Sequence, residues 1–200
     1  MRTAIRVLLA FIALAAIGQQ LRLHLAASYD VVNFFSYFTN LSNLFACAVL
    51  LLCALTSPSK PNGAHDIARF ISTTNMAVVG VVFAALLRNV DLGDLLPWVN
   101  IMLHYVMPVA VVIDWLWQPP AVRLSARHLL LASLFPLLYL AYVLLRGASI
   151  GWYPYPFLNP ANVGGYGGVA AYSVAITITF VTAGSALLWI GNRRRAAAAA

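Results

Sequence analysis

Apolar residues run along this chain in six long stretches that short polar segments separate. The pattern predicts membrane-spanning helices near residues 5–27, 33–55, 67–88, 98–117, 127–146 and 165–191. Each stretch supplies about the 20 residues of helix that a bilayer core requires. Arg2 and Arg6 precede the first stretch as they would in a signal peptide, but the apolar run continues to Ala27 and is too long for one.

Composition agrees with this pattern. Hydrophobic residues make up 62% of the chain, charged residues 8%, and the mean hydropathy is +0.86. A soluble domain is typically about one quarter charged. We therefore expect an all-α polytopic membrane protein with one bundle of six transmembrane helices over residues 1–192 and a solvated basic and alanine-rich tail over 193–200.

Basic residues predict the orientation of this bundle. Three lie on one side, namely Arg22, Arg88 and Arg146, and nine lie on the other, namely Arg2, Arg6, Lys60, Arg69, Arg123, Arg127, Arg193, Arg194 and Arg195. The positive-inside rule places both termini in the cytoplasm. The formal charge of +7 thus reflects topology and attraction to anionic lipid, and no pattern indicates nucleic acid binding.

Metal and cofactor motifs are absent from the sequence. Cys47 and Cys53 both lie in the second predicted span, and their spacing matches no metal site, so we expect packing residues. His104 has no second strong ligand at helical spacing on its own span. We expect neither a metal ion nor a cofactor, and membrane lipids as partners.

Hydrogen-bonding side chains gather near the start of the second span, at Thr39, Asn40, Ser42 and Asn43. Polar groups are costly in hydrocarbon and often mark a function. Thr39 and His104 each lie about six residues, or roughly 9 Å of helix, below the outer face. A hydroxyl and an imidazole can act as nucleophile and general base. Composition and spacing alone favour the simpler interpretation, in which these residues form hydrogen bonds between helices.

Other polar residues surround this pair. Asn100 lies one turn above His104 on the same helix face and can reach the site. Asp114 lies about 15 Å below His104 and cannot orient it, so we expect a counter-ion for Arg123 or Arg127, or an interfacial residue. Arg88 is expected to pair with Asp91 or Asp94. Two roles remain open for Arg146: an ion pair with Asp91 or Asp94, or the binding of an anionic ligand.

The outer segment 151–160 contains three prolines in seven residues, which exclude a regular helix. Its aromatic residues fit either an interfacial belt or a lid over a site among the second, fourth and fifth spans. The glycine-rich segment 164–168 then permits a turn or close packing on re-entry into the membrane.

These residues together resemble the androgen-induced family of six-pass membrane proteins. The resemblance covers nearly the whole chain and is most specific at residues 37–43, which are similar to the bacterial branch, and at Tyr155-Pro156-Phe157, which animal members share. It implies a hydrolase of lipid esters, such as fatty acid esters of hydroxy fatty acids, with Thr39 as nucleophile and His104 as base. It also implies a bacterial cytoplasmic membrane as the location.

The chain departs from the animal members at two points. Asn40-Leu41-Ser42-Asn43 is more polar, and the acid ten residues after the histidine is Asp114 instead of a glutamate. Asn40 or Asn43 is a candidate donor to a developing oxyanion, and Asn100, Arg146 and Tyr155 are candidate substrate-binding residues. Two alternatives remain: a lipid-binding or transport protein with the same cavity and no chemistry, and a closed bundle without a cavity.

Overall fold

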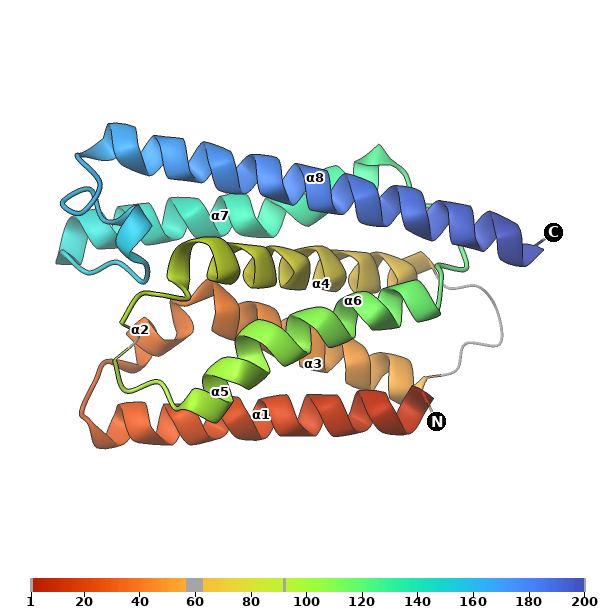
Figure 1. The fold of residues 1–200 in the computed structure, drawn as a ribbon, viewed down its shortest axis with the longest axis horizontal. Helices are drawn as coiled ribbons and strands as arrows, with labels where there is room; N and C mark the ends of the chain where they lie inside the picture. Colours follow the sequence, from red (N-terminus) through yellow and green to blue (C-terminus); the bar gives the residue numbers. More distant parts are fainter. Residues whose placement is uncertain (1, 57–62, 92, 200) are drawn as a thin grey trace.

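The computed structural model describes residues 2–56, 63–91 and 93–199. Throughout these residues it is helical and contains no strand (Figure 1). Six helices are long and apolar enough to cross a membrane: Arg2–Ala26, Phe38–Leu55, Gly63–Leu87, Pro97–Trp117, Ala126–Ile150 and Tyr166–Ala197. The expected six-helix architecture is therefore present, and both marked chain ends lie at the same end of the bundle (Figure 1).

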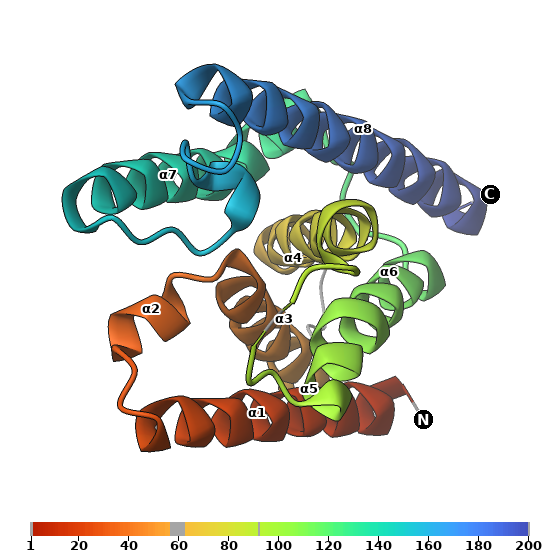
Figure 2. The ribbon, with the colours of Figure 1, turned by 60° about the vertical axis from the view of Figure 1, so that its left-hand side comes forward.

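Helix α4 (Gly63–Val82) lies at the centre of the bundle. Figure 2 shows it between α1 (Arg2–Ala26), α3 (Phe38–Leu55) and α6 (Met107–Trp117) on one side and α7 (Ala126–Ile150) and α8 (Tyr166–Ala199) on the other. This position explains why its polar residues are almost all buried, whereas α7 and α8 expose many apolar side chains. Lipid would cover those apolar faces in a membrane.

The second predicted span is interrupted. A short helix α2 (Val31–Phe35) ends where the Ser36 hydroxyl bonds to the carbonyl of Val32 at 2.7 Å. Tyr37 is extended, with φ −82° and ψ 124°, and α3 begins at the next residue. The expectation of one continuous helix over 33–55 is corrected, because the hydropathy of this segment does not reveal the break.

Two helices widen locally into π-helical turns. These turns are η1 (Phe83–Leu87), which continues α4, and η2 (Met102–Val106), between α5 (Pro97–Ile101) and α6. In η2 the N–H of Met107 donates to the carbonyl of Met102, five residues back. Pro108 follows at once and has no N–H, so it cannot continue a regular hydrogen-bond ladder. Single π-helical turns are often found at functional sites.

The last helix is longer than the sequence pattern indicates. We expected a span over 165–191 and a frayed basic tail, but α8 continues to Ala199. Alanine has the highest helix propensity of all residues, so the terminal alanines extend the helix without help from packing. Arg193 lies over the ring of Trp189, 4.6 Å from its centroid.

Candidate functional site

A cavity of about 510 Å³ opens at the end of the bundle where α1 ends and α3 begins. Its walls come from α1, α2, the start of α3, η2 and the segment 152–162 that joins α7 to α8. Thr39, Asn40, His104 and Tyr155 all line it. The volume lies within the range of about 300–1,000 Å³ that is usual for small-molecule sites. The closed-bundle alternative, which requires no cavity, does not describe this fold.

The start of α3 brings Thr39 into this cavity. The first N–H groups of a helix have no partner within the helix. Here two tyrosine hydroxyls from elsewhere in the chain accept them: Tyr139 bonds to the N–H of Phe38 at 3.2 Å, and Tyr155 bonds to the N–H of Thr39 at 3.3 Å. The Tyr139 hydroxyl donates in turn to the carbonyl of Ser36 at 2.7 Å. The two tyrosines thereby give the first N–H groups of α3 partners from within the chain.

Tyr155 also contacts the side chain of Thr39. Its hydroxyl oxygen lies 3.5 Å from Thr39 Oγ1, and either oxygen can donate. Tyr155 stacks on Phe157 with ring centroids 5.1 Å apart, which fixes the direction of the phenol. Burial raises the pKa of Tyr155, so the hydroxyl keeps its proton at neutral pH.

His104 lies on η2 and lines the same cavity. Its Nδ1 is 3.2 Å from the carbonyl of Asn100. A carbonyl only accepts hydrogen bonds, so Nδ1 carries the proton in this contact and Nε2 retains its lone pair. The imidazole stacks on Phe83, with centroids 4.0 Å apart and planes inclined by 22°. Because Phe83 begins η1, the two π-helical turns meet at this stacked pair.

Thr39 and His104 therefore line one cavity. Their equal depth alone did not predict this, because the second and fourth spans also have to pack together. Both side chains are nearly buried, with 7% and 8% of their surface exposed. Among the described residues no hydrogen bond joins them, and Nε2 of His104 has no hydrogen-bond partner. The cavity between them is accordingly where a third molecule would contact both groups.

A second cavity of about 310 Å³ begins at the same threonine. It runs between α4, α7 and α8 and is almost entirely apolar, with Val78, Leu140 and Phe180 among its walls. Thr39 and Tyr155 line both cavities and thus separate the polar space from the apolar one. Sequence reasoning did not find this second cavity, because no local pattern shows which faces of α7 and α8 leave space between them.

The three asparagines of the predicted site have different surroundings. Asn40 lines the cavity and donates to the carbonyl of Phe34 at 2.8 Å. The amide nitrogen of Asn43 donates to the carbonyls of Thr39 and Leu103, at 2.9 and 3.2 Å, and so ties α3 to η2. These two bonds use both of its N–H groups. Asn100 contributes its backbone carbonyl to His104, and its side chain does not line the cavity.

Arg146 lies outside the cavity. It donates to Asn33 Oδ1 at 2.7 Å and forms an ion pair with Asp30 at 3.4 Å. Its guanidinium also lies over the ring of Trp152, 5.3 Å from the centroid. These contacts join the end of α7 to α2 and to the following loop. Among the described residues its ion-pair partner is Asp30, and not Asp91 or Asp94, the acids that were expected.

The proline-rich loop closes one side of the cavity, the position expected of a lid. Trp152, Tyr153 and Tyr155 line the cavity, and a single short 3₁₀ helix, η3 (Pro156–Leu158), follows. Tyr153 is fixed against α7, because a side chain at Gly147 would collide with its ring. Gly151 ends α7 with φ +71°, a conformation that glycine adopts without strain.

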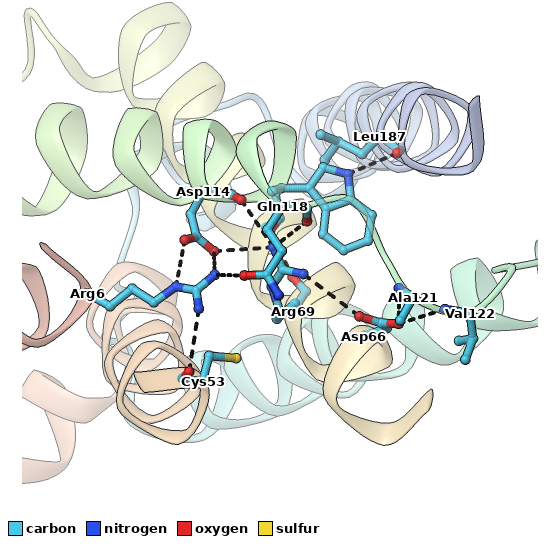
Figure 3. Close-up of polar contacts among 11 residues, drawn as sticks. Arg6, Cys53, Asp66, Arg69, Asp114, Gln118, Ala121, Val122 and Leu187 are labelled. Atoms are coloured by element: carbon cyan, nitrogen blue, oxygen red, sulfur yellow. Dashed lines mark hydrogen bonds and ion pairs between the residues drawn. The ribbon is translucent and has the colours of Figure 1, made fainter. Parts of the chain in front are cut away.

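A buried cluster of charges lies at the opposite end of the bundle, shown in Figure 3. Asp114 accepts hydrogen bonds from Arg6 Nε at 2.7 Å, Arg6 Nη2 at 3.0 Å and Arg69 Nη2 at 3.3 Å. Arg6 also donates to Gln118 at 2.8 Å and to the carbonyl of Cys53 at 3.5 Å. The cluster therefore joins α1, α3, α4 and α6. Asp114 is therefore a counter-ion, but its partners are Arg6 and Arg69 instead of the suggested Arg123 or Arg127.

Asp66 extends the cluster to the loop after α6. It accepts the N–H groups of Ala121 and Val122 at 2.6 and 2.9 Å, and its other oxygen lies 3.8 Å from Arg69 (Figure 3). Arg69 also stacks on Trp115, 5.3 Å from the ring centroid. Sequence reasoning assigned Arg6 and Arg69 to topology alone. No local pattern indicates their buried partners, because these partners lie far away in the sequence.

The structure also bears on the expectations for Arg88 and for the two cysteines. Arg88 forms no ion pair among the described residues; Asp91 accepts the N–H of Gly93, and Asp94 accepts the hydroxyl of Tyr29 at 3.3 Å. The predicted pairing of Arg88 with these acids is therefore wrong. Cys47 and Cys53 are free thiols, and Cys47 is buried in the core.

Comparisons with known proteins do not add to this picture. No family model matches the chain, and neither a curated protein nor a solved structure matches it.

Proposed function

We propose that this protein is an intramembrane hydrolase of lipid esters, with Thr39 as nucleophile and His104 as general base. One observation carries the proposal: Thr39 lies between a polar cavity that contains His104 and an apolar cavity between helices. An ester with a long acyl chain likewise consists of a polar ester group and an apolar chain. Its chain would occupy the apolar cavity and its carbonyl would lie beside Thr39.

The contacts of His104 support its role as base. Its Nδ1–H donates to the carbonyl of Asn100, which leaves the Nε2 lone pair free for a proton. Stacking on Phe83 fixes the plane of the ring. A backbone carbonyl thus does here what an acidic side chain does in other nucleophile–base pairs, by setting the tautomer and direction of the imidazole.

In the proposed reaction, His104 Nε2 takes the proton of Thr39 Oγ1 as this oxygen bonds to the ester carbonyl carbon. The tetrahedral intermediate then breaks its bond to the alcohol oxygen, which receives the proton from the imidazolium. A water molecule, deprotonated by the same Nε2, then attacks the acyl carbon. The bond from this carbon to Thr39 Oγ1 breaks, Oγ1 takes the proton back from the imidazolium, and the fatty acid leaves. Substrate binding would bring Oγ1 and Nε2 into contact, since catalytic hydrogen bonds often tighten only in the complex.

Tyr155 is the best-placed donor to the developing oxyanion. Its oxygen accepts the N–H of Thr39, so its own proton remains available beside the reacting oxygen. Asn43 uses both N–H groups on carbonyls, whereas Asn40 keeps one. An oxyanion donor typically contributes a factor of about 10²–10³ in rate.

The resemblance to the androgen-induced six-pass family supports the same proposal and suggests fatty acid esters of hydroxy fatty acids as a first substrate to test. A bacterial cytoplasmic membrane is the proposed location. The competing function is a lipid-binding or transport protein that uses the same cavities. The missing contact between Thr39 and His104 favours that alternative.

Hydrolysis of a fluorogenic long-chain ester by the purified protein in maltoside micelles separates the two functions. The proposal predicts turnover that falls to background in Thr39→Ala and in His104→Ala. Thr73→Ala is the matched control, because Thr73 is equally buried, bonds only to the carbonyl of Arg69 and lines neither cavity. Equal turnover in all variants, or none in the folded wild type, would reject the hydrolase.

A further inference from the structure

Aromatic rings line much of the outer cavity. Its lining includes five tyrosine and tryptophan side chains: Tyr29, Tyr37, Trp152, Tyr153 and Tyr155. Tyr37 lies edge-on to Trp152 and to Tyr155, with centroids 5.8 and 5.7 Å apart and interplanar angles of 86° and 80°. Rings set at right angles form adjoining walls. Aromatic ring faces carry negative charge density, so rings that line a cavity favour a cation inside it.

The charges of this cavity have one sign. Asp91 and Asp94 line it, and no arginine or lysine is among its described lining residues. Both residues are exposed, and each carboxylate accepts one hydrogen bond: Asp91 from the N–H of Gly93, and Asp94 from the hydroxyl of Tyr29. A cleft lined by charges of one sign attracts ions of the opposite sign. This cavity therefore favours cations over anions.

One contact in the structure already pairs a cation with one of these rings. The guanidinium of Arg146 lies 5.3 Å from the ring centroid of Trp152, although Arg146 does not line the cavity. Deeper inside, His104 is 8% exposed, and its Nε2 is without a partner in the described chain. A ligand that fills the cavity therefore meets aromatic rings, two exposed carboxylates and the unpaired Nε2 of the buried His104.

We propose that the outer cavity binds an alkylammonium group, of the quaternary type found in choline, between the aromatic rings and the two carboxylates. Quaternary ammonium ions bind to aromatic faces because they are weakly hydrated and carry a spread positive charge. As a statement about binding, the inference stands alone. If the ligand is also a substrate, the inference rests on the proposed hydrolase. The enzyme would then prefer esters that carry a cationic group at the outer end.

Saturation-transfer NMR in maltoside micelles tests this binding with a matched pair of probes. Choline carries a trimethylammonium group, and 3,3-dimethylbutan-1-ol has the same shape without the charge. We expect transfer to choline and little to the neutral probe. Removing one carboxylate should weaken choline binding by about fivefold, the value for a unit charge about 4 Å away in water. Added salt should weaken it as well.

The variants are Asp91→Asn and Asp94→Asn, which keep an acceptor oxygen for the existing hydrogen bonds. Asp30→Asn is the control, since Asp30 lies on the same face but does not line the cavity. Equal transfer to both probes, or unchanged choline binding in the double variant, would overturn the inference. Stronger binding of dihexanoylphosphatidylcholine than of choline would identify a lipid headgroup as the source of the cation, and equal binding a free solute.

Failure of this inference can be told apart from failure of the hydrolase. Thr39→Ala should retain choline binding whether or not the wild type hydrolyses esters. Hydrolysis of neutral and cationic esters at equal rates, with no choline binding, would leave the hydrolase intact and reject the ammonium site.

Discussion

The buried cluster around Asp114 allows a stability prediction with a magnitude. Arg6 and Arg69 are 6% and 4% exposed, and Asp114 is the acid that both contact. Asp114→Asn keeps the size of the side chain and one acceptor oxygen but removes the negative charge. Breaking a buried pair from one side costs about 3–5 kcal/mol. Because 18% of the Asp114 side chain is exposed, we expect the lower end of this range, about 3 kcal/mol.

Thermal unfolding followed by intrinsic fluorescence in maltoside micelles measures this effect. For a chain of this length, 1 kcal/mol corresponds to roughly 2–4 °C, so Asp114→Asn should lower the apparent Tm by roughly 6–12 °C. Asp30→Asn is the comparison, because its pair with Arg146 is 53% exposed on the acid side. An exposed pair contributes at most about 1 kcal/mol, so Asp30→Asn should lower the Tm by less than about 4 °C.

A second substitution tests the cause. If the loss comes from an unpaired buried cation, replacing Arg6 by Met in the Asp114→Asn protein should restore part of the Tm, although Arg6→Met alone lowers it. Equal Tm values for Asp114→Asn and Asp30→Asn, or additive losses in the double variant, would refute the assignment of this cluster as the electrostatic tie between α1, α4 and α6.

Three further predictions concern single residues. Gly147→Ala should displace the ring of Tyr153 and the loop after α7, and so lower ester turnover with a smaller effect on Tm; unchanged turnover would show that the loop does not shape the cavity. Tyr155→Phe should reduce turnover by about 10²-fold. Because burial raises the pKa of Tyr155 above 10, the contribution of its hydroxyl should persist in the wild type as the pH rises past 10 and be lost only at higher pH. A loss of turnover below pH 9 that depends on Tyr155 would contradict the assignment. Asn75→Leu should raise the Tm, because both amide atoms of Asn75 are buried without partners, which costs about 1–3 kcal/mol; a lower Tm would show that the amide has a partner that the protein chain does not provide.

Hydropathy was sufficient to predict the six spans, because a run of about 20 apolar residues in a membrane has few alternatives to a helix. It could not locate the break at Ser36 and Tyr37 or the π-helical turns, since these depend on where tertiary contacts satisfy backbone groups. The tyrosine hydroxyls that accept the first N–H groups of α3 come from about 100 residues further along the chain.

The equal depth of Thr39 and His104 was readable from the sequence, because helix rise converts position into depth. The identity of neighbouring helices was not, and this is why Asp114 was assigned the wrong arginines. Arg6 lies 108 residues from Asp114. The role of Asn100 was missed for a related reason: its backbone carbonyl, and not its side chain, contacts His104.

Covalent labelling with a lipid-like fluorophosphonate tests the central claim most directly. An activated Thr39 would displace fluoride from the probe and remain bonded to phosphorus, which mass spectrometry of the labelled peptide can locate. We predict labelling of the wild type and of Thr73→Ala, no labelling of Thr39→Ala, and strongly reduced labelling of His104→Ala. An unlabelled but folded wild type, or a label that persists in Thr39→Ala, would contradict the account.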